Sequence, residues 1–158
     1  MPKILFGVAT VLTCAVLVQF YLAAVGTFST AGSGRYAAHE IVGTIVLPTL
    51  SLLAVAMCLL MRVDRATVLL AAAPLLGVLV EFALFALNLW LSGGPTTSGT
   101  IKWAGTLILG LHPMVGLVML GSCLLLWKRA CRGISPPPSP SAVTVKSVNA
   151  ENDRQPRR

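Results

Sequence analysis

The chain has 158 residues, of which 56% are hydrophobic and only 11% are charged, whereas soluble domains carry about 25% charged residues. An ordinary soluble domain is therefore excluded, because the chain lacks the polar surface that would face water, and lipid is the solvent that fits. The formal net charge is +7. The basic residues lie at the ends of apolar runs and near the C-terminus, not in a patch with interleaved aromatic residues, so nucleic acid is not an expected partner.

Four apolar runs are long enough to cross a bilayer, because a hydrocarbon core of about 30 Å needs roughly 20 helical residues. None of them contains Lys or Arg, and backbone polar groups in lipid must be bonded within the protein, so each run is predicted to be a helix. The predicted fold class is an all-α membrane protein, with a four-transmembrane-helix bundle in residues 1–132. The runs are approximately Ile4–Phe28, Ala37–Met61, Ala66–Leu91 and Trp103–Trp127.

The distribution of basic residues predicts the orientation. If the N-terminus is inside, six basic residues flank the spans on the cytoplasmic side and two on the outer side, so the positive-inside rule places both termini in the cytoplasm. Residues 133–158 are rich in Pro and Ser and are predicted to be a disordered basic cytoplasmic tail. The inner residues are Lys3, Arg62, Arg65, Lys128, Arg129 and Arg132, and the outer ones are Arg35 and Lys102.

The two halves of the chain share an order of features. Val16–Phe20 reads Val-Leu-Val-Gln-Phe in the first run, and Val78–Phe82 reads Val-Leu-Val-Glu-Phe in the third. The second and fourth runs each carry His-x-x-Val-Gly, beginning at His39 and at His112. This order predicts two copies of one helical hairpin, related by a pseudo-two-fold axis along the membrane normal.

The histidines are the main candidates for chemistry. His39 and His112 are the only two in the chain, and each is followed four residues later, on the same helix face, by a glycine, Gly43 or Gly116. A missing side chain beside each histidine would leave room for a flat ligand. Imidazole is a common haem ligand, so the pattern suggests His39 and His112 as axial ligands of haem b. The alternative is a pair of packing histidines, with glycines that let helices approach closely.

Gln19 and Glu81 occupy matched positions on the first and third runs, and Glu81 is the only carboxylate deep within a span. We expect both to belong to the same site and to tune it, either by orienting a histidine or, for Glu81, by relaying protons. The alternative for Glu81 is a protonated acid that bonds to a neighbouring helix.

The segment Gln19–Ala23, His39 with Gly43, and Leu111–Pro113 with Gly116 resemble uncharacterised four-helix membrane proteins of actinobacteria. That resemblance covers the four-helix part of the chain and implies a bacterial plasma membrane, but no activity. The paired-histidine hairpins are also similar in architecture to cytochrome b561-type haem bundles, which implies a haem-bearing bundle.

Three hypotheses follow. The first is a b-type haem protein that passes electrons within the membrane. The second is a non-enzymatic membrane component that packs with a partner protein or with further copies of itself. The third is a small proton-coupled carrier that uses Glu81. No sequence motif decides whether the chain is an enzyme.

Overall fold

The computed structural model describes residues 2–30, 33–92 and 103–132, and every regular element in these residues is helical. The predicted disordered tail, residues 133–158, lies outside the described residues, as do residues 93–102 between the third and fourth spans. The elements are α1 (Pro2–Thr27), α2 (Tyr36–Ile41), the π-helical segment η1 (Val42–Val46), α3 (Leu47–Leu60), α4 (Arg65–Ser92) and α5 (Trp103–Arg132).

Four helical spans are long and apolar enough to cross a membrane: α1, the unit α2–η1–α3, α4 and α5. This confirms the predicted all-α fold with four transmembrane helices and makes the chain a multi-pass membrane protein. The last helix continues beyond the predicted end at Trp127 to Arg132. The added residues include Lys, Arg and Ala, which are good helix formers and extend the helix past the apolar run.

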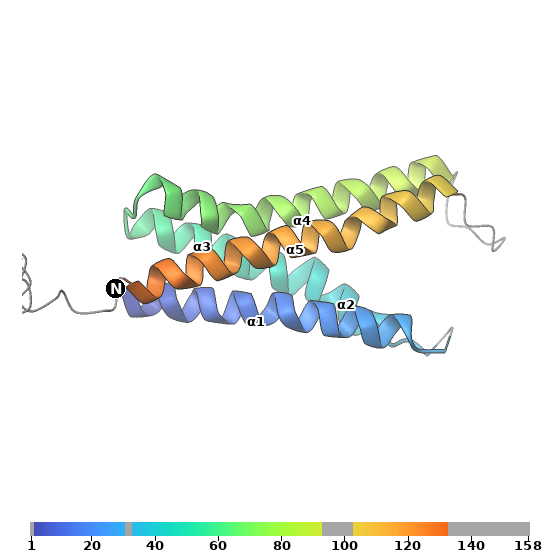
Figure 1. Ribbon diagram of the computed structural model, residues 1–158, viewed down its shortest axis with the longest axis horizontal. Coiled ribbons are helices and arrows are strands. Elements are labelled where there is room, and N and C mark those ends of the chain that lie inside the picture. Colours follow the sequence, from blue (N-terminus) through green and yellow to red (C-terminus); the bar gives the residue numbers. More distant parts are fainter. Residues whose placement is uncertain (1, 31–32, 93–102, 133–158) are drawn as a thin grey trace, which may run out of the picture.

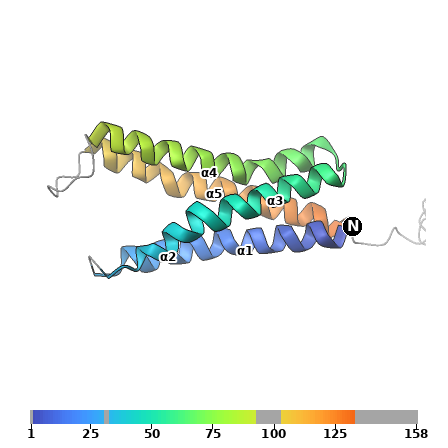
Figure 2. The same ribbon diagram turned by 180° about the vertical axis from the view of Figure 1, so that it is seen from behind.

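The helices form a closed ring of neighbours, in which α1 packs on α3, α3 on α4, α4 on α5, and α5 on α1. The start of α1, the α3–α4 turn and the end of α5 lie together at one end (Figure 1). Toward the other end the α1–α2 pair separates from the α4–α5 pair, as both views show (Figures 1 and 2). We call residues 2–16, 47–78 and 119–132 the terminal half, and residues 17–30, 33–46, 79–92 and 103–118 the loop half.

The core lies in the terminal half. Every buried hydrophobic side chain among the described residues belongs to it. Many of these side chains are small, and small residues let transmembrane helices approach closely. The terminal half is therefore closely packed, whereas the loop half has no comparable core. The buried residues are Leu5, Ala9, Leu12, Val16, Leu47, Ala54, Cys58, Ala71, Val78, Met119, Cys123, Leu126 and Ala130.

The second span changes its helical winding close to His39. In η1 the Leu47 amide bonds to the Val42 carbonyl, five residues earlier, and Pro48 then supplies no amide at all. On the C-terminal side of this segment, α3 contacts both α1 and α4. On its N-terminal side, α2 packs on α1. Single π-helical turns often lie at functional sites, and this one begins three residues after His39.

Candidate functional site

Polar side chains from all four spans meet in the loop half. They are Gln19 on α1, His39 on α2, Glu81 on α4 and His112 on α5, and we call them the polar cluster. The structure thus brings together the four polar residues that the sequence singled out. Each hairpin contributes one polar residue and one histidine, which bond to each other.

In the first pair, His39 is held through both of its ring nitrogens. Its Nδ1 lies 3.2 Å from the backbone oxygen of Gln19. A carbonyl oxygen only accepts, so Nδ1 carries the proton and donates it, and Nε2 of the neutral ring keeps a lone pair. The Gln19 side-chain amide donates to the His39 backbone oxygen at 3.0 Å and lies 3.4 Å from His39 Nε2.

In the second pair, His112 Nδ1 lies 2.5 Å from Glu81 Oε2. One proton must lie between these two atoms at that distance. When Nδ1–H donates to the carboxylate, Nε2 of His112 also keeps a lone pair. No hydrogen bond joins this nitrogen to any residue that the structure describes. Both imidazoles are therefore oriented by an oxygen at Nδ1. Nε2 of His112 has no partner among the described residues, whereas Nε2 of His39 lies against the Gln19 amide.

The two histidine rings face each other across the gap between the hairpins. Their centroids are 5.9 Å apart and their planes meet at 78°. Tyr36 lies beside His39 with a centroid distance of 6.2 Å, and Phe85 lies beside His112 at 5.4 Å. Each histidine thus has a second aromatic neighbour on its own hairpin, and both of these neighbours are exposed. The sequence analysis did not identify Tyr36 or Phe85, because neither stands in a recognisable pattern with a histidine.

The glycines have a different environment from the one expected. A Cβ atom added at Gly43 would lie 2.7 Å from Gln19 Nε2, and one added at Gly116 would lie 3.0 Å from the ring of Phe20. The space beside each glycine is thus occupied by a side chain of α1. Gly43 admits the Gln19 amide that bonds to His39, so it supports the polar cluster through Gln19. The expected space for a flat ligand beside each glycine is therefore filled.

Two acceptors in the polar cluster lack a donor. Gln19 Oε1 and Glu81 Oε1 are buried, and neither has a hydrogen-bond partner among the described residues. Buried polar atoms in folded proteins are nearly always bonded. The described side chains therefore leave two acceptors of this cluster without a donor, as they also leave Ser51 Oγ in the terminal half without a partner.

The polar cluster contains two imidazoles, the donor type that commonly holds a haem iron. Histidines that bind metals usually donate their other ring N–H to an oxygen, as both histidines do here. Within the described residues no three His, Cys, Asp or Glu side chains gather as they would in an all-protein metal site. Haem needs only two protein ligands, because the porphyrin supplies the others.

Comparisons with protein-family profiles, with curated proteins and with solved structures found no match to this chain. The fold and the polar cluster define a class: a four-helix membrane protein in which two hairpins present facing histidines. The functional argument rests on that geometry.

Proposed function

We propose that this chain is a b-type haem-binding membrane protein that passes electrons within the bilayer, with His39 and His112 as the axial ligands. The observation that carries the proposal is the facing pair of imidazoles, 5.9 Å apart, each contributed by a different hairpin. Both have an oxygen acceptor at Nδ1, which leaves Nε2 of His112 for the iron, while the Gln19 amide would have to give up its contact with Nε2 of His39.

The residues of the cluster have separate roles in this proposal. His39 and His112 hold the group. The Gln19 backbone carbonyl and the Glu81 carboxylate fix the orientation of the two rings. Phe20, Tyr36 and Phe85 give the loop half an apolar, aromatic lining. Bound haem would supply reversible one-electron chemistry at its iron.

The proposal includes the cellular setting. Both termini would face the cytoplasm, because six basic residues lie at the terminal end of the described spans and Arg35 alone lies at the loop end. The resemblance to actinobacterial four-helix proteins would place the chain in a bacterial plasma membrane, and the likeness to cytochrome b561-type bundles agrees with two axial histidines.

The test is the visible spectrum of the full chain, expressed with ample haem precursor and purified in detergent. The wild type should show a Soret band that shifts on reduction, and both His39→Ala and His112→Ala should lose it. The control is Leu111→Ala, a lipid-facing change beside His112 that should keep the band. A folded, colourless wild type would contradict the proposal, as would a band that survives both histidine substitutions.

A second candidate is a proton-coupled carrier. It is favoured by Glu81, whose Oε2 bonds to His112 and whose buried Oε1 has no hydrogen-bond partner among the described residues. Such a carboxyl can exchange its proton with the histidine and with a second donor. The measurement is proton flux into liposomes that contain a colourless preparation of the chain, followed with an internal pH dye. If the chain is such a carrier, the wild type should conduct protons and Glu81→Gln should abolish that flux. The absence of proton flux with the wild-type protein would exclude this function.

A further inference from the structure

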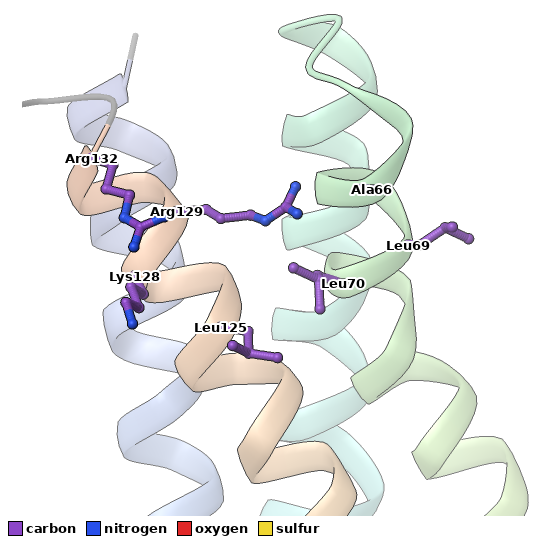
Figure 3. Close-up of a pocket in the computed structure, with 7 residues that line it drawn as sticks. All are labelled: Ala66, Leu69, Leu70, Leu125, Lys128, Arg129 and Arg132. Atoms are coloured by element: carbon purple, nitrogen blue, oxygen red, sulfur yellow. The ribbon is translucent and has the colours of Figure 1, made fainter.

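A pocket of about 500 Å³ lies between α4 and α5 in the terminal half, at the opposite end of the bundle from the polar cluster. Its lining includes Leu69 and Leu70 from α4, and Leu125, Lys128, Arg129 and Arg132 from α5. Figure 3 shows Arg129 extending from α5 toward α4, with Leu70 pointing back from α4 toward α5. The pocket therefore combines three cations with apolar walls.

The positive charge of this pocket is only partly compensated. Arg129 donates to Asp64 Oδ1 at 3.1 Å and to Thr67 Oγ1 at 3.2 Å, which fixes its guanidinium across the gap between the two helices. Lys128 and Arg132 form no ion pair with any residue that the structure describes. One acid thus faces three bases, and the pocket has an excess of positive charge that an anion would neutralise.

The apolar walls face outward from the bundle. The side chains of Leu69 and Leu125 are 69% and 54% exposed, and both belong to membrane-spanning helices, so lipid chains cover them in a bilayer. Trp127 precedes Lys128 directly, and tryptophans of membrane proteins concentrate at the boundary between hydrocarbon and headgroups. The cations therefore lie at headgroup depth, with the leucines in the hydrocarbon beside them.

We propose that this pocket binds an anionic phospholipid, with its phosphate at Lys128, Arg129 and Arg132 and its acyl chains against Leu69 and Leu125. Basic pockets between helices at the cytoplasmic boundary are suited to such headgroups. Arg129 still has N–H groups to offer a phosphate after its contacts with Asp64 and Thr67, because a guanidinium has five donors. A free phosphate ion would use the cations but not the leucines, so the lipid is the better match. This proposal does not depend on haem binding.

The experiment measures lipid binding to the full chain in detergent, with phosphatidylglycerol as the probe, phosphatidylcholine as the neutral lipid and inorganic phosphate as a competitor. The variant is Lys128→Gln/Arg132→Gln. Its matched control, Lys3→Gln/Arg65→Gln, removes one Lys and one Arg from the same end of the bundle, and neither residue lines the pocket. All four side chains are exposed, so both variants should fold, and thermal unfolding checks this.

We expect phosphatidylglycerol to bind at least tenfold more tightly than phosphatidylcholine. The pocket variant should weaken phosphatidylglycerol binding about tenfold and the control less than twofold, and millimolar phosphate should not displace the lipid. If both variants lost the same affinity for phosphatidylglycerol, the lipid would be attracted to the basic end of the bundle as a whole. That result would overturn the assignment of lipid binding to this pocket. Displacement by inorganic phosphate, or equal binding of the two lipids, would overturn the assignment to an anionic phospholipid.

Discussion

The two halves of the bundle are both apolar in composition, but their helices contact one another in different ways. In the terminal half, small and medium side chains of four spans interlock, and the buried apolar residues all lie there. In the loop half the hairpins separate, and the contacts between them include the rings of His39 and His112 and the approach of Phe20 to Gly116. In lipid no hydrophobic effect drives helices together, so helix association depends on packing and hydrogen bonds. The buried side chains of the terminal half pack closely, whereas the polar pairs of the loop half are joined by hydrogen bonds.

The largest loss of stability should follow from a cavity in the core of the terminal half. Leu12 is fully buried, and Leu12→Ala should lower the free energy of unfolding by about 2 kcal/mol, near the lower limit for core Leu→Ala changes, because lipid rather than water is the solvent. Leu111→Ala in the loop half removes a side chain that is 52% exposed and should change stability by less than about 0.5 kcal/mol. Reversible unfolding in mixed micelles measures both. Similar losses would remove the distinction between the halves.

A smaller effect should follow from breaking one pair in the loop half. Glu81→Ala leaves His112 Nδ1 without its acceptor and should cost about 1 kcal/mol, since hydrogen bonds between transmembrane helices average about 0.6 and reach about 1.7 kcal/mol. Glu81→Gln keeps an acceptor and should cost less. A double-mutant cycle with His112→Ala isolates the pair. A coupling energy near zero would mean that the bond does not hold the two helices together.

The glycines offer a steric test of the same region. The Cβ of Gly43→Ala would press on Gln19 Nε2, so we expect a loss of about 1 kcal/mol relative to Gly110→Ala, whose Cβ meets nothing within 4 Å. In a Gln19→Ala background the cost at Gly43 should disappear, because the obstructing amide is gone. Thermal unfolding of the four variants is sufficient. A cost that persists without Gln19 would place the obstruction elsewhere.

The smallest effect concerns the turn that closes the terminal half. Asp64 begins α4 by accepting from the Thr67 amide and hydroxyl. The hydroxyl bond of Thr67, followed by its amide bond and the charge of Arg129, lowers the pKa of Asp64 below its ordinary 3.8. Its contribution to stability is therefore complete above about pH 5 and is lost as the pH falls through the lowered pKa.

The variant Asp64→Asn keeps a capping side chain that does not titrate. Between pH 7 and pH 3 the wild type should lose slightly more stability than this variant, in denaturant titrations at each pH. The difference should be small, because Asp64 is exposed. If the variant lost as much as the wild type, the capping carboxylate would have no part in the acid response.

Much of the fold was accessible from sequence, because length and apolar composition alone define a membrane span. The four helices follow from the absence of Lys and Arg in the apolar runs. The polar cluster was accessible for a related reason: Gln19, His39, Glu81 and His112 are costly in lipid, so they were expected to face one another. The repeated hairpin stays a prediction, although the two bonded pairs are consistent with it.

Other features depend on three-dimensional packing and could not be predicted. The π-helical turn at Val42–Val46 arises where Pro48 interrupts the bonding of a span that is uniformly apolar in sequence. Gly43 and Gly116 suggested open space, but only the packing of α1 reveals that Gln19 and Phe20 fill it. The basic pocket likewise requires α5 to continue to Arg132 beside the start of α4, where Arg129 reaches Asp64.

The central claim, that the loop half is a binding site and the terminal half a core, is tested most directly by thermal unfolding of the haem-free chain with and without added haem. At a haem concentration of 100 times Kd, binding should stabilise the wild type by about 2.7 kcal/mol. Leu12→Ala should start from a lower melting temperature and gain the same increment, whereas His39→Ala/His112→Ala should gain none. No gain in the wild type, or an equal gain in the double histidine variant, would contradict the account.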